Sequence, residues 1–135
     1  MPADYFFDHS HNLVYSYAQG PLSFNEMIDH QCRLRNDPQF RDTMNQLIDF
    51  CSVTELHIAS AGVRHLSEAS FFSATSRRAI VVDGRDVMFG LARMYEILRD
   101  RGPEQITVFR SFPEALKWLD LPPDYPRKCQ PVSSE

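Results

Sequence analysis

The sequence predicts one α/β domain built on a five-stranded, mostly parallel sheet. Two observations carry that prediction. From residue 13 onward, short runs of β-branched and aromatic residues alternate with stretches of helical spacing, as in strands joined by crossover helices. The chain has 135 residues, 43% of them apolar, without a repeat or a linker, which suits a single core. We place the domain at residues 1–120 and expect 121–135, a polar segment with four prolines, to be a loosely packed or disordered tail.

The N-terminal residues predict an antiparallel hairpin. Residues 5–7 and 13–17 are aromatic and β-branched, and the polar stretch 8–12 separates them. Gly20 and Pro21 are expected to end the second strand. The first strand then pairs antiparallel with the second.

The first helix is predicted by its ends. Ser23 and Glu26 have the spacing of a capping box, in which each side chain bonds the other residue's backbone N–H. Apolar residues recur at helical spacing from 24 to 34. The helix is expected to end by Asn36, because the residue before Pro38 is biased out of the helical region.

The central stretch predicts a strand, a loop and a helix. Residues 46–50 form a short apolar run that contains Asp49, and 51–58 are expected to be a loop. Helical spacing follows over 60–72.

The rest of the chain repeats the alternation. Residues 78–82 have the composition of a strand buried on both faces. A helix over 86–101 carries a wide apolar stripe and ends at Gly102. The last strand is expected at 106–109, and a short helix follows the cap residue Ser111. The predicted element order is β-β-α-β-α-β-α-β-α.

Composition narrows the functional classes. A formal net charge of −4 disfavours nucleic acid as the main partner. No apolar stretch reaches the ~20 residues of a membrane span, and the N-terminus lacks the pattern of a signal peptide. Three cysteines without a CxxC motif argue against a disulfide framework. We therefore expect a cytoplasmic protein.

Residues 47–62 resemble the STAS, or SpoIIAA-like, fold family. The resemblance rests on the segments 47–50, 53–54 and 58–62. In anti-sigma factor antagonists of that family, a strand leads through a similar segment into a helix, and a serine of the segment is phosphorylated. Across nearly the whole chain, the sequence also looks like bacterial STAS/SEC14-like proteins, which mostly have no assigned function.

The resemblance implies roles for two residues. By position, Ser60 matches the phosphoacceptor and Gly62 the glycine that follows it. Ala59 and Ala61 stand where the family pattern has an Asp and a second Ser. The alternative interpretation of Ser60 is an unmodified N-cap.

Polar residues are expected to gather where the parallel strands end. In a parallel sheet, the carboxyl ends of strands face the amino ends of helices along one rim, where ligands and anions bind. The alternative is that these side chains only cap helices. The expected members of this binding rim are Asp49, Ser60, Gly62, Asp83, Arg85, Arg110 and Ser111.

Surplus apolar residues suggest a second type of site. One sheet face does not need all the large side chains, so some are expected to line a pocket for an apolar ligand or to form a dimer face. The alternative is an ordinary core. The expected members are Phe71, Phe72, Met88 and Tyr95.

Catalytic and metal sites are not predicted. The histidines lack the convergent spacing that zinc needs, and no cofactor motif occurs. Cys51 after a strand is typical of a small buried hydrophobe. Arg77 and Arg78 either bind a carboxylate or phosphate or lie solvated where a strand begins, and we expect the second. The sequence thus predicts a non-enzymatic, protein-binding or self-associating regulatory module, with a carrier or sensor of an apolar small molecule as the alternative.

Overall fold

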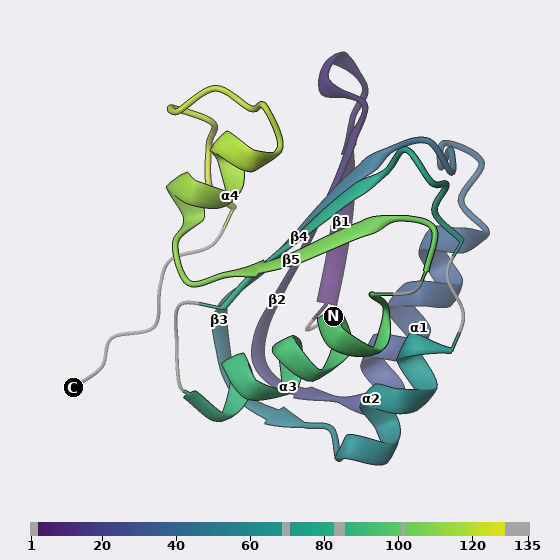
Figure 1. The fold of residues 1–135 in the computed structure, drawn as a ribbon, viewed down its shortest axis with the longest axis vertical. Helices are drawn as coiled ribbons and strands as arrows, with labels where there is room; N and C mark the ends of the chain where they lie inside the picture. The colour runs from purple at the N-terminus through teal and green to yellow at the C-terminus, as the bar shows by residue number, and fades with distance from the viewer. Residues whose placement is uncertain (1–2, 69–70, 83–85, 101, 129–135) are drawn as a thin grey trace.

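A computed structural model describes residues 3–68, 71–82, 86–100 and 102–128 of the chain. These residues form five strands and four α-helices, which alternate from the second strand onward, with one short 3-10 turn at His9–His11 after the first strand (Figure 1). None of the described helices has the length and apolar character needed to cross a membrane. The strands are β1 Ala3–Asp8, β2 Leu13–Ser23, β3 Asn45–His57, β4 Arg77–Val81 and β5 Gln105–Phe109. The α-helices are α1 Phe24–Arg35, α2 Ser60–Ser67, α3 Asp86–Leu98 and α4 Phe112–Trp118.

The strands lie in the sheet in the order of the sequence, β1-β2-β3-β4-β5. The β1–β2 pair is antiparallel and the other three pairs are parallel. From β2 onward, each strand is followed in the sequence by the strand next to it in the sheet, always in the same direction across the sheet. Right-handed crossovers therefore place α1, α2 and α3 on one face of the sheet. The predicted fold class and element order are confirmed.

Two of the predicted helix starts are confirmed in detail. Ser23 Oγ accepts a hydrogen bond from the Glu26 N–H at 3.3 Å, and Glu26 Oε1 accepts one from the Ser23 N–H at 2.9 Å. Ser111 Oγ accepts a bond from the Glu114 N–H at 3.4 Å at the start of α4. Both caps satisfy N–H groups that have no partner within their helices.

The two central strands are longer than predicted. β2 continues through Gly20 and Pro21 to Ser23, and its register against β3 shifts on both sides of Gly20. Gly20 has φ 68°, which glycine adopts without strain. The irregular register accommodates a glycine and a proline that would interrupt a regular ladder. The predicted end of β2 at this point is therefore wrong.

β3 shows the same difference. It runs to His57, so the expected loop over 51–58 is strand for nearly its whole length. The extension pairs with the second half of β2, as far as Ser23 opposite His57. In contrast, β4 pairs with β3 only from Gln46 to Asp49.

Two helices are shorter than predicted. α2 ends at Ser67. Phe71 and Phe72 stack on each other with ring centroids 5.2 Å apart, and each meets Phe40 edge-on at 5.3 Å. α3 ends at Leu98, before the predicted stop at Gly102. The predicted extension of α2 as far as Phe72 is therefore wrong.

The two faces of the sheet carry separate cores. α1, α2 and α3 cover one face, where Ile48 and Ile80 are buried. α4 lies apart from those helices in Figure 1 and packs on the other face, over Leu47 and Val81. The sequence argument for surplus apolar residues considered one sheet face, whereas helices cover both faces. The alternation of side chains along β3 and β4 supplies both cores.

The C-terminal segment packs on the α4 face. Leu121 and Tyr125 are buried, and the Tyr125 hydroxyl donates to Asp8 Oδ2 at 2.7 Å. The Lys128 N–H donates to the Tyr15 hydroxyl at 3.0 Å. Residues 121–128 are therefore part of the packed structure, and the expectation of a loose tail is wrong for them. Residues 129–135 lie outside the described part of the chain.

Candidate functional site

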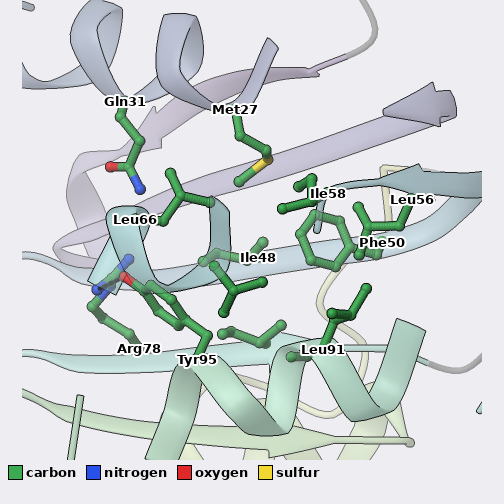
Figure 2. Close-up of a pocket in the computed structure, with 13 residues that line it drawn as sticks. Met27, Gln31, Ile48, Phe50, Leu56, Ile58, Leu66, Arg78, Leu91 and Tyr95 are labelled. Atoms are coloured by element: carbon green, nitrogen blue, oxygen red, sulfur yellow. Dashed lines mark hydrogen bonds between the residues drawn. The ribbon is translucent and has the colours of Figure 1, made fainter. Parts of the chain in front are cut away.

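An apolar cavity of about 60 Å³ lies between the sheet and the three helices α1, α2 and α3. Figure 2 shows Met27 and Gln31 reaching into it from α1, with Leu66 of α2 beside Gln31 and Leu91 of α3 on the far side. β3 and β4 supply its floor. The complete lining is Met27, Gln31, Ile48, Phe50, Leu56, Ile58, Val63, Leu66, Arg78, Ile80, Leu91, Ala92 and Tyr95.

One end of the cavity is polar. Arg78 and Tyr95 lie there together in Figure 2, and Arg78 Nη1 donates to the Tyr95 hydroxyl at 2.9 Å. Arg78 Nε donates to Gln46 Oε1 at 2.9 Å. The cavity is therefore amphipathic, with alkyl and aromatic walls and a hydrogen-bonded polar end.

Arg78 is 2% exposed, so its positive charge must be compensated by buried hydrogen-bond acceptors or by a buried negative charge. Glu104 Oε1 lies 3.8 Å from Arg78 Nη1 and 2.8 Å from Arg99 Nη2. The Phe72 ring lies 4.6 Å from the Arg78 guanidinium carbon. The expectation that Arg78 is solvated is wrong. Its place in the strand alternation, two residues before the buried Ile80, is the signal that would have found it.

A surface groove and a second cavity adjoin the first. The groove, about 120 Å³, lies between α1 and α2 and is lined by Cys32, His65 and Phe71 among others. The second cavity, about 20 Å³, is lined by Ser16, Gln46 and His30 among others. Gln31 lines all three spaces, so it stands where they meet.

His30 is buried beside the second cavity, with 5% of its surface exposed. Its Nε2 lies 3.0 Å from Ser16 Oγ, while its Nδ1 has no hydrogen-bond partner in the described part of the chain. Burial, with a smaller contribution from Arg33, lowers the pKa of His30 to about 4. The ring is therefore neutral at pH 7. The sequence offered no signal for this residue beyond a histidine on a helix.

Asp49, the first predicted rim residue, does not lie at a strand end. It is fully buried in the middle of β3. Arg127 donates to both of its carboxylate oxygens at 2.9 Å, and the Tyr15 hydroxyl donates at 3.0 Å. Asp49 therefore belongs to the α4 face of the sheet, under the C-terminal segment.

Ser60 and Gly62 lie in the first turn of α2, and Ser60 is exposed. Ala59 is the N-cap and makes no side-chain hydrogen bond, so Ser60 is not the cap that sequence reasoning offered as an alternative. A Cβ on Gly62 would lie 2.9 Å from Phe24 Cδ1 and 3.1 Å from Ile58 Cγ2. Gly62 thus permits close packing of α2 on Phe24.

The remaining rim residues form a separate group. Arg110 Nη2 donates to Asp86 Oδ1 at 2.8 Å, and the Phe89 ring lies 4.0 Å from the Arg110 guanidinium carbon. Ser111 caps α4 nearby in sequence. Asp83 and Arg85 lie outside the described residues. β3 extends from Asp49 to His57 beyond its last pairing with β4, about 25 Å at the usual rise per residue. That extension separates the start of α2 from the ends of β4 and β5.

Of the four predicted apolar residues, Tyr95 lines the cavity. Phe71 lines the outer groove. Phe72 is buried with Val14 and Leu34, and Met88 is buried in the core under the three helices. The large apolar residues exposed in the described part of the chain are Ile97 and Leu98, at the end of α3. Self-association through an apolar face stays a prediction.

Cysteine chemistry differs from the expectation at one residue. Cys32 has a free, exposed thiol. Cys51 is buried but disulfide-bonded, so the sequence argument against disulfides is wrong at this residue, and its description as a simple buried hydrophobe is incomplete. The predicted cytoplasmic location stays a prediction.

The comparisons with known proteins agree with this architecture. No protein-family model matches the chain, and no curated protein matches it. A solved structure does: an uncharacterised protein of the DUF3478 family from Shewanella loihica PV-4, which has a SpoIIAA-like fold. The two share 18% sequence identity with a TM-score of 0.54 over 87% of this chain and 93% of the other. This protein has a SpoIIAA-like fold. The fold expected from the resemblance at residues 47–62 is therefore confirmed.

Proposed function

We propose that this SpoIIAA-like protein is a non-enzymatic binding domain that carries or senses an apolar or amphipathic small molecule. The single observation that carries the proposal is the cavity under α1, α2 and α3, with its alkyl walls and one polar end. Ligand sites in proteins have this composition, with mostly apolar walls and a few placed polar groups.

The volume and the walls favour an organic ligand over solvent. A water molecule needs only ~10–15 Å³ of such volume but also two to four polar partners. The cavity of about 60 Å³ has room for more than one water. Arg78 and Tyr95 bond each other at its polar end, and the remaining lining beyond Gln31 is apolar. A slim alkyl chain suits these walls better than water does.

The test compares probe binding before and after the cavity is filled. Ala92 lines the cavity, and Ala92→Val places two more carbon atoms there. Gly90→Ala, on the same helix with no atom within 4 Å of the new Cβ, is the matched control. n-Octanol is expected to raise the thermal unfolding midpoint of the wild type and of Gly90→Ala. Ala92→Val, folded by circular dichroism, is expected to lose most of that response. An equal response in all three proteins, or none in the wild type, contradicts the proposal.

A second candidate function is docking to a protein partner through the start of α2. Ser60 is exposed, and the first turn of α2 has no side-chain cap. A phosphate on Ser60 would lie beside backbone N–H groups and the positive end of the helix dipole. These features support a phosphorylation switch of the kind that the STAS resemblance implies.

Intact-mass analysis of the protein purified from its own cells tests this second function. One added phosphate that is absent from Ser60→Ala supports it. Absence of phosphate, together with unchanged cross-linking to cellular proteins by Ser60→Asp, removes it. The cavity proposal is independent of either result, because Ser60 does not line the cavity.

A further inference from the structure

A directed chain of hydrogen bonds fixes the proton on His30. Arg78 Nε can only donate, so Gln46 Oε1 accepts from it at 2.9 Å. The amide nitrogen of Gln46 then donates to Ser16 Oγ at 3.0 Å. Ser16 Oγ has one proton of its own, and its other partner in the described part of the chain is His30 Nε2 at 3.0 Å.

Two arrangements of that last bond differ in what they leave unpaired. If Ser16 donates to His30 Nε2, the imidazole proton lies on Nδ1, and one N–H has no acceptor. If His30 Nε2 donates instead, both the Ser16 hydroxyl proton and the bare Nδ1 are left unpaired. A buried polar group without a partner destabilises the fold, so the first arrangement is favoured. His30 therefore presents an Nδ1–H donor inside the protein.

The His30 ring that carries this donor lies beside the proposed ligand site. His30 lines the cavity of about 20 Å³, which shares Met27, Gln31, Ile48 and Phe50 with the larger apolar cavity. The groove between α1 and α2 shares Gln31 and Leu66 with the larger cavity. All three spaces share Gln31 in their linings. Their small volumes, about 120, 60 and 20 Å³, favour an unbranched chain.

We propose that the ligand is a neutral, unbranched molecule with a carbonyl oxygen, and that the His30 Nδ1–H donates a hydrogen bond to that oxygen. This inference rests on the proposed function and adds the chemical class of the ligand. A neutral carbonyl is favoured over a carboxylate because one uncharged donor does not compensate the burial of a full negative charge. Arg78, a buried cation that lines the larger cavity, is already bound to Gln46 and Tyr95.

The test uses three probes with eight carbons: methyl hexyl ketone, n-octane and octanoate. Binding is measured by titration followed by NMR on the wild type and on His30→Gln. The glutamine Oε1 can accept the bond from Ser16 in place of Nε2, and glutamine has no donor at the position of Nδ1. His30→Gln is expected to weaken binding of the ketone roughly three- to tenfold. It is expected to leave n-octane binding unchanged.

Each outcome separates the inference from the function on which it rests. Binding of neither the ketone nor n-octane overturns the proposed function. An unchanged ratio of ketone to n-octane binding in His30→Gln, or tighter binding of octanoate than of the ketone, overturns the inference alone. A second measurement needs no variant: long-range ¹H–¹⁵N correlation spectra are expected to show His30 as the Nδ1–H tautomer. The Nε2–H tautomer in the ligand-free protein also overturns the inference.

Discussion

The Arg127 guanidinium donates to both carboxylate oxygens of Asp49, with both distances 2.9 Å, and so joins the C-terminal segment to the middle of β3. Asp49 is fully buried and Arg127 is 19% exposed in its side chain. The Arg127 guanidinium carbon also lies 4.6 Å from the centre of the Phe112 ring. These contacts make residues 121–128 part of the domain.

Arg127→Met is expected to destabilise the protein by about 3–5 kcal/mol, because it leaves the Asp49 carboxylate buried without its cation. Methionine retains much of the packing on Phe112. Urea unfolding followed by circular dichroism measures the change in the free energy of unfolding. Lys117→Met, at an exposed position of α4, is the control and is expected to change it by less than about 0.5 kcal/mol. An equal, small effect of both substitutions would contradict the assigned ion pair.

The neighbouring residues Arg77 and Arg78 provide a test of the buried hydrogen-bond network around Arg78. Arg78→Met breaks the buried bonds to Gln46 and Tyr95 and is expected to cost about 3 kcal/mol. Arg77 has 42% of its side chain exposed and lies 3.6 Å from Asp120, so Arg77→Met is expected to cost about 1 kcal/mol or less. Urea unfolding midpoints at equal m-values distinguish the two. A larger loss for Arg77→Met would show that the buried network is not the stronger of the two.

The pH dependence of stability follows from His30. Its pKa is about 4 in the folded protein against the ordinary 6.5, so below pH 6.5 the unfolded chain binds a proton that the folded chain does not. Stability is therefore full above about pH 6.5 and is lost as the pH falls toward 4, by up to about 3 kcal/mol. The charged groups around His30 are Arg33, Asp4, Arg78 and Asp29.

Chemical denaturation between pH 7 and pH 4 measures this loss. His30→Gln is expected to have a flatter profile, because glutamine does not titrate. Hydrogen bonds from Ser10, Tyr125 and His11 outweigh burial and lower the pKa of Asp8, so both proteins are expected to lose further stability at more acidic pH. Identical profiles down to pH 4 would contradict the burial of a neutral His30.

Two glycines in helices give a packing test. Gly62→Ala places a Cβ 2.9 Å from Phe24 Cδ1, and the overpacking is expected to cost about 1–2 kcal/mol. Gly90→Ala meets no atom within 4 Å, and it is expected to stabilise α3 by about 0.5–1 kcal/mol. The thermal unfolding midpoint shows whether each substitution stabilises or destabilises the protein. Phe24→Leu is expected to relieve much of the cost of Gly62→Ala, and a stabilising Gly62→Ala would refute the close contact.

Local chemistry explains which parts of the fold could be predicted from the sequence. The Ser23 cap depends on residues three positions apart, and the predicted capping box is present. The end of β2 depended on the partner strand: Gly20 and Pro21 lie in irregular register against β3. No local rule reveals that a neighbour will continue a strand through a glycine and a proline.

The site depended even more on distant contacts. Tyr95 was found because a wide apolar stripe on a helix is visible in the sequence. Arg78 and His30 were not, since their burial depends on Glu104, Gln46 and Ser16, which are far away in the chain. The burial of Asp49 was also missed. Its partner, Arg127, is 78 residues away, so nothing in the local sequence distinguishes Asp49 from a polar residue at the rim. Long-range polar pairing has no periodicity from which it can be predicted.

The most direct test of the ligand cavity is a methyl NMR titration with methyl hexyl ketone. The methyl signals of Met27, Leu66 and Leu91, which line the cavity, are expected to shift together and saturate. Those of Leu116 and Leu121, on the α4 face, are expected to stay in place. Shifts confined to the α4 face, or no saturable shift at the cavity methyl groups, would contradict the account.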